Sequence, residues 1–174
     1  EKRIEEMVGV LGRVRALGHD VHLHLVGPIG EDGYGRWVHR LCLENRGWIQ
    51  VEGEKHGEEK KRILATHRFS MNACPREAFG ISVAEAAKAG CIVFVPSEGG
   101  QAEIVEHPML TFDGPEAAIA KIDAVLRQPE LQQELSRHLA ERGKAFSIAA
   151  FIAGMRQAVS RFLQERKAGE HSTP

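Results

Sequence analysis

Hydrophobic and polar positions along the chain alternate between two periods. Apolar residues recur at helical spacing between Ile4 and Leu17, and the following segment "VHLHLVG" has the apolar, β-branched character of a buried strand. Helical and strand-like segments then take turns as far as "MLTF" at positions 109–112. Such alternation is typical of a parallel sheet with right-handed crossovers, so the pattern predicts a doubly wound α/β domain with helices on both faces.

The predicted elements can be placed by residue range. Strand-like segments lie at 21–27, 47–53, 68–74, 91–97 and 109–112, and we expect a Rossmann-like parallel sheet of about six strands. Helices are expected between them and then in succession at 113–126, 129–145 and from 147 onward. Asp113 and Ser147 are expected to act as helix N-caps, and Pro129 is expected to open a helix.

Composition and charge narrow the class of protein. The 174 residues are 43% hydrophobic and 27% charged, which suits one domain over 1–166 with a real core, followed by a disordered tail at 167–174. Because 23 Lys and Arg are balanced by 24 Asp and Glu, charge favours neither nucleic acid nor an anionic membrane as partner. Three cysteines without C-x-x-C spacing predict reduced thiols, and the absence of a long apolar run predicts a cytoplasmic domain.

Two glutamates stand out in the stretch from Cys74 to Val105. Glu77 lies in a loop after the predicted strand 68–74, and Glu85 lies in the helix that follows. In a doubly wound sheet, ligands bind where such loops lead into helix N-termini, and the first backbone amides of a helix bind phosphate. Gly80 allows close approach of a ligand, Ser82 adds a hydroxyl, and the Glu85 carboxylate suits ribose hydroxyls. The stretch therefore indicates a nucleotide-linked ligand.

The order of these residues resembles a known family. "EAFGISVAEAAKAG" followed by "VPSEGGQAEIV" is similar to the E-x7-E signature and the following G-G-x-x-E loop of the retaining glycosyltransferases of group 1, also called family 4. The resemblance extends from "EKRIEEMVGVL" to the helices after "DGPEAAIAKI". It implies the C-terminal half of the two-domain GT-B architecture, which binds a nucleotide-diphosphate-sugar donor.

The resemblance also implies roles for individual residues. Glu77 matches the glutamate beside the reacting sugar, and Lys2 matches the lysine that neutralises the departing diphosphate. Glu85 matches the ribose-binding carboxylate. The remaining matches are expected to contact the sugar donor or to border its site: Phe79, Gly80, Ile81, Ser82, Gly27, Gly99, Gly100 and Glu103.

The resemblance implies further parts that the chain does not match. The family's arginine would lie before Glu1, Arg3 does not occupy its position, and the acceptor-binding N-terminal domain has no counterpart here. We therefore expect a fragment that binds the sugar donor but is inactive alone. The other half is expected to hold an acceptor glycan or lipid-linked sugar, and to allow peripheral association with a membrane. The nucleotide base, the sugar and the acceptor stay open.

Several other readings of the sequence compete with this one. The same binding residues suit a non-catalytic nucleotide-sugar module, and a related GT-B enzyme such as a sugar epimerase or a glycogen-synthase-like protein is a further alternative. A glycosidase is disfavoured because its carboxylates must flank a scissile bond. His22 and His24 share one face of a strand, but no carboxylate or cysteine completes a metal set, so neither a metal nor another cofactor is expected.

Overall fold

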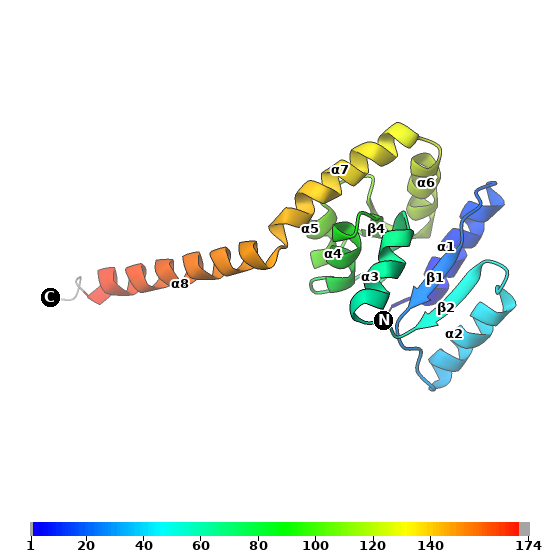
Figure 1. Ribbon diagram of the computed structural model, residues 1–174, viewed down its shortest axis with the longest axis horizontal. Coiled ribbons are helices and arrows are strands. Elements are labelled where there is room, and N and C mark those ends of the chain that lie inside the picture. The colour runs from blue at the N-terminus through cyan, green and yellow to red at the C-terminus, as the bar shows by residue number, and fades with distance from the viewer. Residues whose placement is uncertain (1, 171–174) are drawn as a thin grey trace.

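A computed structural model describes residues 2–170 of the chain (Figure 1). It contains five strands: β1 (Leu23–Val26), β2 (Ile49–Gly53), β3 (Phe69–Met71), β4 (Ile92–Pro96) and β5 (Thr111–Phe112). Eight helices accompany them: α1 (Ile4–Ala16), α2 (Gly33–Glu44), α3 (Gly57–Thr66), α4 (Ile81–Lys88), α5 (Gly100–Val105), α6 (Gly114–Leu126), α7 (Pro129–Ala145) and α8 (Ile148–Glu170).

The strands confirm the predicted parallel α/β arrangement but correct its details. All three strand pairings are parallel, in a two-stranded sheet β1-β2 and a three-stranded sheet β3-β4-β5. The expectation of about six strands in one sheet was wrong. After β5 the described chain continues only as helices, so no sixth strand forms there. The three residues of β3 pair with β4 and make no ladder with β1, which leaves a seam between the two sheets.

The core is centred on β4, whose five residues are all buried. A strand that is apolar throughout, as here, is typical of a sheet covered on both faces. Two groups of helices provide that cover: α1 packs along α6, while α4, α5 and α7 pack on one another, and α6 and α7 both contact β4. A smaller cluster, which includes Leu25, Val38 and Ile49, lies between α2 and the strands β1 and β2. Helix α1 joins the two clusters, because Val10 and Val14 pack in the larger one and Val8 in the smaller.

A carboxylate of α6 that contacts the turn after α1 predicts acid sensitivity. His19 Nε2 lies 2.6 Å from Asp123 Oδ1, and Arg127 Nε donates to the same oxygen at 2.8 Å. The hydrogen bond from His19, followed by that from Arg127, lowers the pKa of Asp123 below its ordinary value of 3.8. Because the folded carboxyl has the lower pKa, its stabilising effect is present above about pH 4 and is lost as the pH falls through the folded value.

We therefore expect Asp123→Asn to flatten the dependence of the melting temperature on pH on the acid side. The measurement is thermal unfolding followed by circular dichroism between pH values of about 2 and 5. Asp20→Asn is the matched control, because Asp20 is fully exposed and its contact with Arg15 is long, at 3.6 Å. Equal acid slopes for wild type and both variants would contradict the assignment.

The two predicted N-caps differ in outcome. Ser147 Oγ accepts a hydrogen bond from the backbone amide of Ala150 at 3.1 Å, which confirms it as a cap of α8. Asp113 does not cap α6 with its side chain. Its carboxylate instead accepts a hydrogen bond from Ser97 Oγ, which ties the start of α6 to the loop after β4.

The last helix projects from the rest of the molecule (Figure 1). The sequence favoured a tail beginning at residue 167, whereas α8 continues to Glu170. Residues 171–174 lie outside the described part of the chain. The helical spacing of apolar residues after Ser147 predicts an apolar side of α8 that forms core or the seam with another domain. It is not core here, because these side chains are exposed: Ile148, Phe151, Ile152, Met155, Val159, Phe162 and Leu163. Within residues 2–170, no helix combines the length and apolarity needed to cross a bilayer.

Candidate functional site

The loop that carries Glu77 begins at the carboxyl end of β3 and ends at the N-terminus of α4. The backbone amide of Asn72 donates to Phe94 O at 2.9 Å, and the Asn72 side chain accepts from the Cys74 amide at 2.8 Å, so the loop leaves the sheet in a fixed turn. It ends at Gly80, whose φ of 94° lies in the left-handed region that glycine tolerates. The loop therefore has an anchored start and a glycine-dependent end.

The structure brings together the two residues assigned to the reacting centre. Lys2 Nζ donates to Glu77 Oε2 at 2.8 Å, although the residues are 75 positions apart in the sequence. The Lys2 side chain is 60% exposed and that of Glu77 23% exposed, so solvent screens the pair and its contribution to folding is small. The contact places a cation next to the carboxylate at the mouth of the loop.

Gly99 and Gly100 support the Glu77 loop from behind. The Gly100 amide donates to Glu77 O at 2.9 Å. A Cβ atom at Gly99 would lie 2.6 Å from Glu77 O, and one at Gly100 would lie 2.3 Å from Ala78 O, both far inside contact distance. The sequence assigned these glycines to the border of the sugar-donor site, and the structure shows the physical reason for glycine there: main chain packs directly on main chain.

Gln101 is a positioning residue that the sequence analysis missed. Its side chain is fully buried, and its Nε2 donates to Cys74 O at 2.5 Å, which ties α5 to the start of the Glu77 loop. Gly80 packs against the same residue, since a Cβ there would lie 3.1 Å from Gln101 Cβ. Its neighbours in the sequence, Gly100, Ala102 and Glu103, do not mark it as buried, so no local signal pointed to its role.

The N-terminus of α4 presents the expected groups to solvent. Phe79, Ile81 and Ser82 are exposed, and no side chain caps the first amides of the helix. Glu85 lies farther along the same helix and forms an ion pair with Lys60 of α3. The end of α4 thus combines free backbone N–H groups with an acid and a base on its flank, an arrangement that suits an anion bearing hydroxyl groups.

Two assigned residues lie apart from the Glu77 loop. Gly27 follows β1, has a φ of 142°, and donates its amide to Gly53 O at 2.9 Å, so it ends the β1-β2 ladder. Glu103 has an exposed side chain in α5, and its carbonyl accepts a hydrogen bond from Arg142 at 2.5 Å. The structure gives each a clear backbone role and shows no contact of either residue with Glu77.

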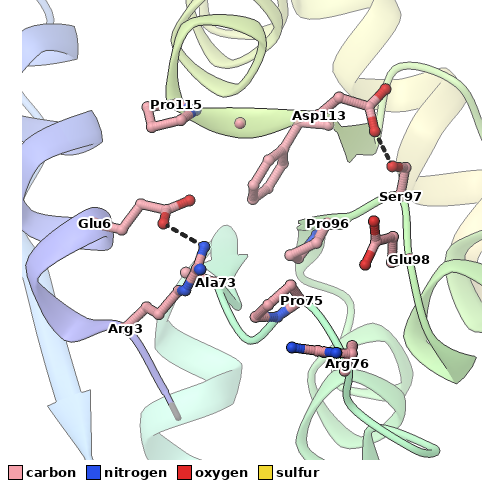
Figure 2. A pocket seen from close by; sticks show the side chains of 12 residues that line it. Arg3, Glu6, Ala73, Pro75, Arg76, Pro96, Ser97, Glu98, Asp113 and Pro115 are labelled. Carbon is pink, nitrogen blue, oxygen red and sulfur yellow. Dashed lines mark hydrogen bonds and ion pairs between the residues drawn. The ribbon is translucent and has the colours of Figure 1, made fainter.

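A cavity of about 560 Å³ opens beside the Glu77 loop (Figure 2). The N-terminal end of α1 forms one wall, where Arg3 Nη1 donates to Glu6 Oε2 at 3.0 Å. The loops at the carboxyl ends of β3, β4 and β5 form the others. Its described lining contains none of the residues assigned to the sugar donor, although Arg76 precedes Glu77: Arg3, Glu6, Ala73, Pro75, Arg76, Pro96, Ser97, Glu98, Phe112, Asp113, Gly114 and Pro115.

The geometry can be compared with known families of proteins. A family model described as "Glycosyl transferases group 1" matches residues 1–145, which include all of the assigned site residues. This chain belongs to that family. The family predicted from the sequence is thereby confirmed, and the parallel strands and intervening helices confirm the predicted α/β fold class.

Individual relatives show how far the similarity extends. Sucrose synthase 4 of rice (Oryza sativa subsp. japonica) is 37% identical over 67 residues, which cover 37% of this chain and 8% of that protein. The pneumococcal O-GlcNAc transferase GtfA, solved in complex with UDP and GlcNAc, superposes with a TM-score of 0.78 at 15% identity. Sucrose-phosphate synthase of Thermosynechococcus elongatus superposes with a TM-score of 0.76 at 21% identity.

The superposed region is nearly all of this chain but only a part of each structural neighbour. The superpositions cover 93% and 94% of this chain, but only 33% of GtfA and 43% of sucrose-phosphate synthase. The chain thus spans less than half of either protein. At these low identities the structural similarity establishes a shared fold alone, whereas the family membership rests on the sequence match.

Proposed function

We propose that this domain binds the nucleotide-diphosphate-sugar donor of a retaining group 1 glycosyltransferase at the N-terminus of α4. The observation that carries the proposal is the contact between Lys2 and Glu77 at 2.8 Å, beside a helix end with uncapped amides. The diphosphate would accept hydrogen bonds from the amides near Ile81 and Ser82. The sugar would lie next to Glu77, and the ribose hydroxyls would reach Glu85.

Each charged group would have a separate task during transfer. Negative charge develops on the diphosphate as its bond to the sugar breaks, and the Lys2 ammonium together with the α4 amides would stabilise that charge. Glu77 would position the sugar and stabilise positive charge near the anomeric carbon; we do not assign it the part of a covalent nucleophile. In the described structure the Lys2 ammonium contacts this carboxylate. A bound sugar donor would therefore have to displace that contact and lie between the two side chains.

Glu85 and Lys60 would adjust when the nucleotide binds. Their side chains are 42% and 33% accessible, although the paired oxygen, Glu85 Oε2, is itself buried. A ribose could take the Glu85 carboxylate as acceptor for its two hydroxyls, while Lys60 stays close enough to balance the charge.

The complete transfer reaction would need more than the described site. We propose that an acceptor-binding half, in the same protein, faces this domain and supplies the glycan or lipid-linked acceptor, in the cytoplasm. The 33% and 43% shares of the structural neighbours that this chain covers support a larger whole. By itself the domain would bind the sugar donor without transferring the sugar.

Replacing Glu85 by alanine should weaken binding of a nucleoside diphosphate about tenfold to a hundredfold, since hydrogen bonds to a charged acceptor contribute about 1.5–3 kcal/mol. The measurement is calorimetric titration with UDP, GDP and ADP and with their sugar conjugates. UDP is the first ligand to test, because the structural neighbour GtfA was solved with it.

Glu58→Ala is the matched control for charge. Glu58 is 81% exposed on α3 and forms an ion pair with Lys61, just as Glu85 forms one with Lys60. Its replacement should leave nucleotide affinity unchanged. Binding that is equally strong in both variants would contradict the assigned ribose contact. Binding that depends on Glu85, with no transfer once the acceptor half is present, would favour the non-catalytic binding module.

A further inference from the structure

Three histidines meet at the seam between the two sheets. His22 precedes β1, His24 lies within it, and His67 ends α3 just before β3. Their ring centroids lie 4.4 Å apart for His24 and His67, 5.1 Å for His22 and His24, and 5.9 Å for His22 and His67. One ring nitrogen from each lies within 4.8 Å of those of the other two. The sequence pointed to His22 and His24 alone; the fold supplies the third.

Hydrogen bonds fix which nitrogen of His67 carries the proton. Its Nδ1 lies 2.6 Å from Ile63 O, and a carbonyl oxygen only accepts, so Nδ1 must be the donor. In the neutral ring this leaves a lone pair on Nε2. That atom is buried and has no hydrogen-bonding partner among the described residues. A buried, unsatisfied acceptor is costly unless something binds it.

His24 is held in the same manner. Its Nδ1 lies 2.7 Å from Glu52 Oε1, and an ionised carboxylate accepts this hydrogen bond. The two side chains are only 20% and 16% exposed, which protects the contact from solvent. A carboxylate behind one ring nitrogen orients the ring and makes the other nitrogen a better ligand, as in carboxylate–histidine–zinc arrangements.

We propose that His22, His24 and His67 bind one Zn²⁺ ion, with Glu52 and the Ile63 carbonyl orienting two of the rings. Imidazole nitrogen is a ligand for zinc and related transition metals, whereas calcium and magnesium prefer oxygen. Nitrogen ligands of one tetrahedral zinc ion lie about 3.4 Å apart, so small side-chain rotations from the present separations would complete the set. His22 is exposed, which leaves room for water as fourth ligand.

The ion would join the two sheets, whose neighbouring strands β1 and β3 form no ladder. The ladders connect β1 with β2 and β3 with β4, and none connects β1 with β3. His22 and His24 belong to one side of this seam and His67 to the other. Zinc would therefore stabilise the folded chain by linking α3 and β3 to β1. This inference does not depend on the proposed sugar-donor site.

The test is titration of the metal-free 174-residue chain with Zn²⁺ by calorimetry, and with Co²⁺ by visible absorption, which reports tetrahedral coordination. We expect one ion per chain and a rise in melting temperature with metal concentration. His67→Gln should abolish saturable binding. His56→Gln is the control at the opposite end of α3, because His56 is 81% exposed and pairs with Glu54 instead. Circular dichroism establishes that both variants fold.

Glu52→Gln gives a second, independent readout. It leaves all three ligands in place but weakens the orienting hydrogen bond to His24, so metal affinity should fall about tenfold to a hundredfold. Absence of saturable binding to the wild type, or equal binding by His67→Gln and His56→Gln, would overturn the proposal. In that case the three rings would pack only as aromatic neighbours.

Discussion

Replacing Gly100 with alanine is expected to remove nucleotide binding and to lower the free energy of unfolding by about 1–3 kcal/mol, the usual cost of overpacking. The added Cβ would lie 2.3 Å from Ala78 O and 3.0 Å from Phe79 Cα, and neither is a flexible side-chain end that can rotate away. The loop must therefore move, and Glu77 moves with it. Urea denaturation gives the stability, and calorimetric titration with UDP gives the affinity.

Gly9→Ala provides the matched control for this substitution. Gly9 lies inside α1, and nothing is within 4 Å of a Cβ built on it. Alanine there should raise the free energy of unfolding by about 0.5–1 kcal/mol, because glycine is the poorer helix former. Its UDP affinity should equal that of the wild type. A Gly100→Ala variant that binds UDP normally would refute the idea that main-chain packing sets the position of Glu77.

The second large effect is expected from Leu139→Ala on α7. Leu139 is 1% exposed in the larger core cluster, and truncation of such a leucine costs about 2–5 kcal/mol. The same helix holds the C-terminal end of α5, where Arg142 donates to Glu103 O and His138 Nε2 lies 2.7 Å from Val105 O. Loosening α7 should therefore also loosen α5, and with it the Gln101 side chain behind the Glu77 loop.

Leu43→Ala is the control for this substitution. It makes the same change from leucine to alanine at an exposed position, so it tests whether burial causes the loss of stability. Leu43 also lies in a helix but is 63% exposed, so its replacement should change the free energy of unfolding by less than about 0.5 kcal/mol. Chemical denaturation of both variants measures the contrast. Similar losses for the two leucines would mean that α7 is not anchored in the core as described.

Much of the fold could be predicted because local signals mark its elements. The apolar run of β4 and the prolines that open α6 and α7 are explicit in the sequence. The division of the sheet could not be predicted, because it depends on whether β1 and β3 form a ladder, and the pattern of each strand alone does not determine its neighbour. The exposure of the apolar side of α8 was missed for a related reason: helical periodicity shows that a face exists, not what covers it.

The candidate site, like the fold, has some features that local sequence predicts and others that it does not. The order of Glu77, Gly80 and Glu85 along one loop and helix is a local property, and it led directly to the prediction of a sugar-donor site there. The contact between Lys2 and Glu77, by contrast, joins residues 75 positions apart. The family resemblance singled out both residues but did not predict that they touch. Gln101 was missed because its importance comes from the buried carbonyl of Cys74 that it satisfies.

The three histidines at the seam between the sheets show that spacing along the sequence does not identify every member of a cluster. His22 and His24 stand two apart, which the sequence shows directly, but their third neighbour comes from the end of another helix. Nothing in the residues around His67 marks it as a ligand. Its significance comes from the hydrogen bond between Nδ1 and the Ile63 carbonyl, which frees the other nitrogen and exists only in the folded chain.

The main-chain contact between the Glu77 loop and the two glycines has a consequence for how such a site can diversify. Atoms that every residue type possesses set the position of the carboxylate, so the side chains beside it are free to vary. Arg76, Ala78 and Glu98 are all exposed around this contact. In the proposed sugar-donor site, a library randomised at these three positions would explore new sugar preferences while the position of Glu77 stays the same, whereas the glycines behind the loop would tolerate almost no change.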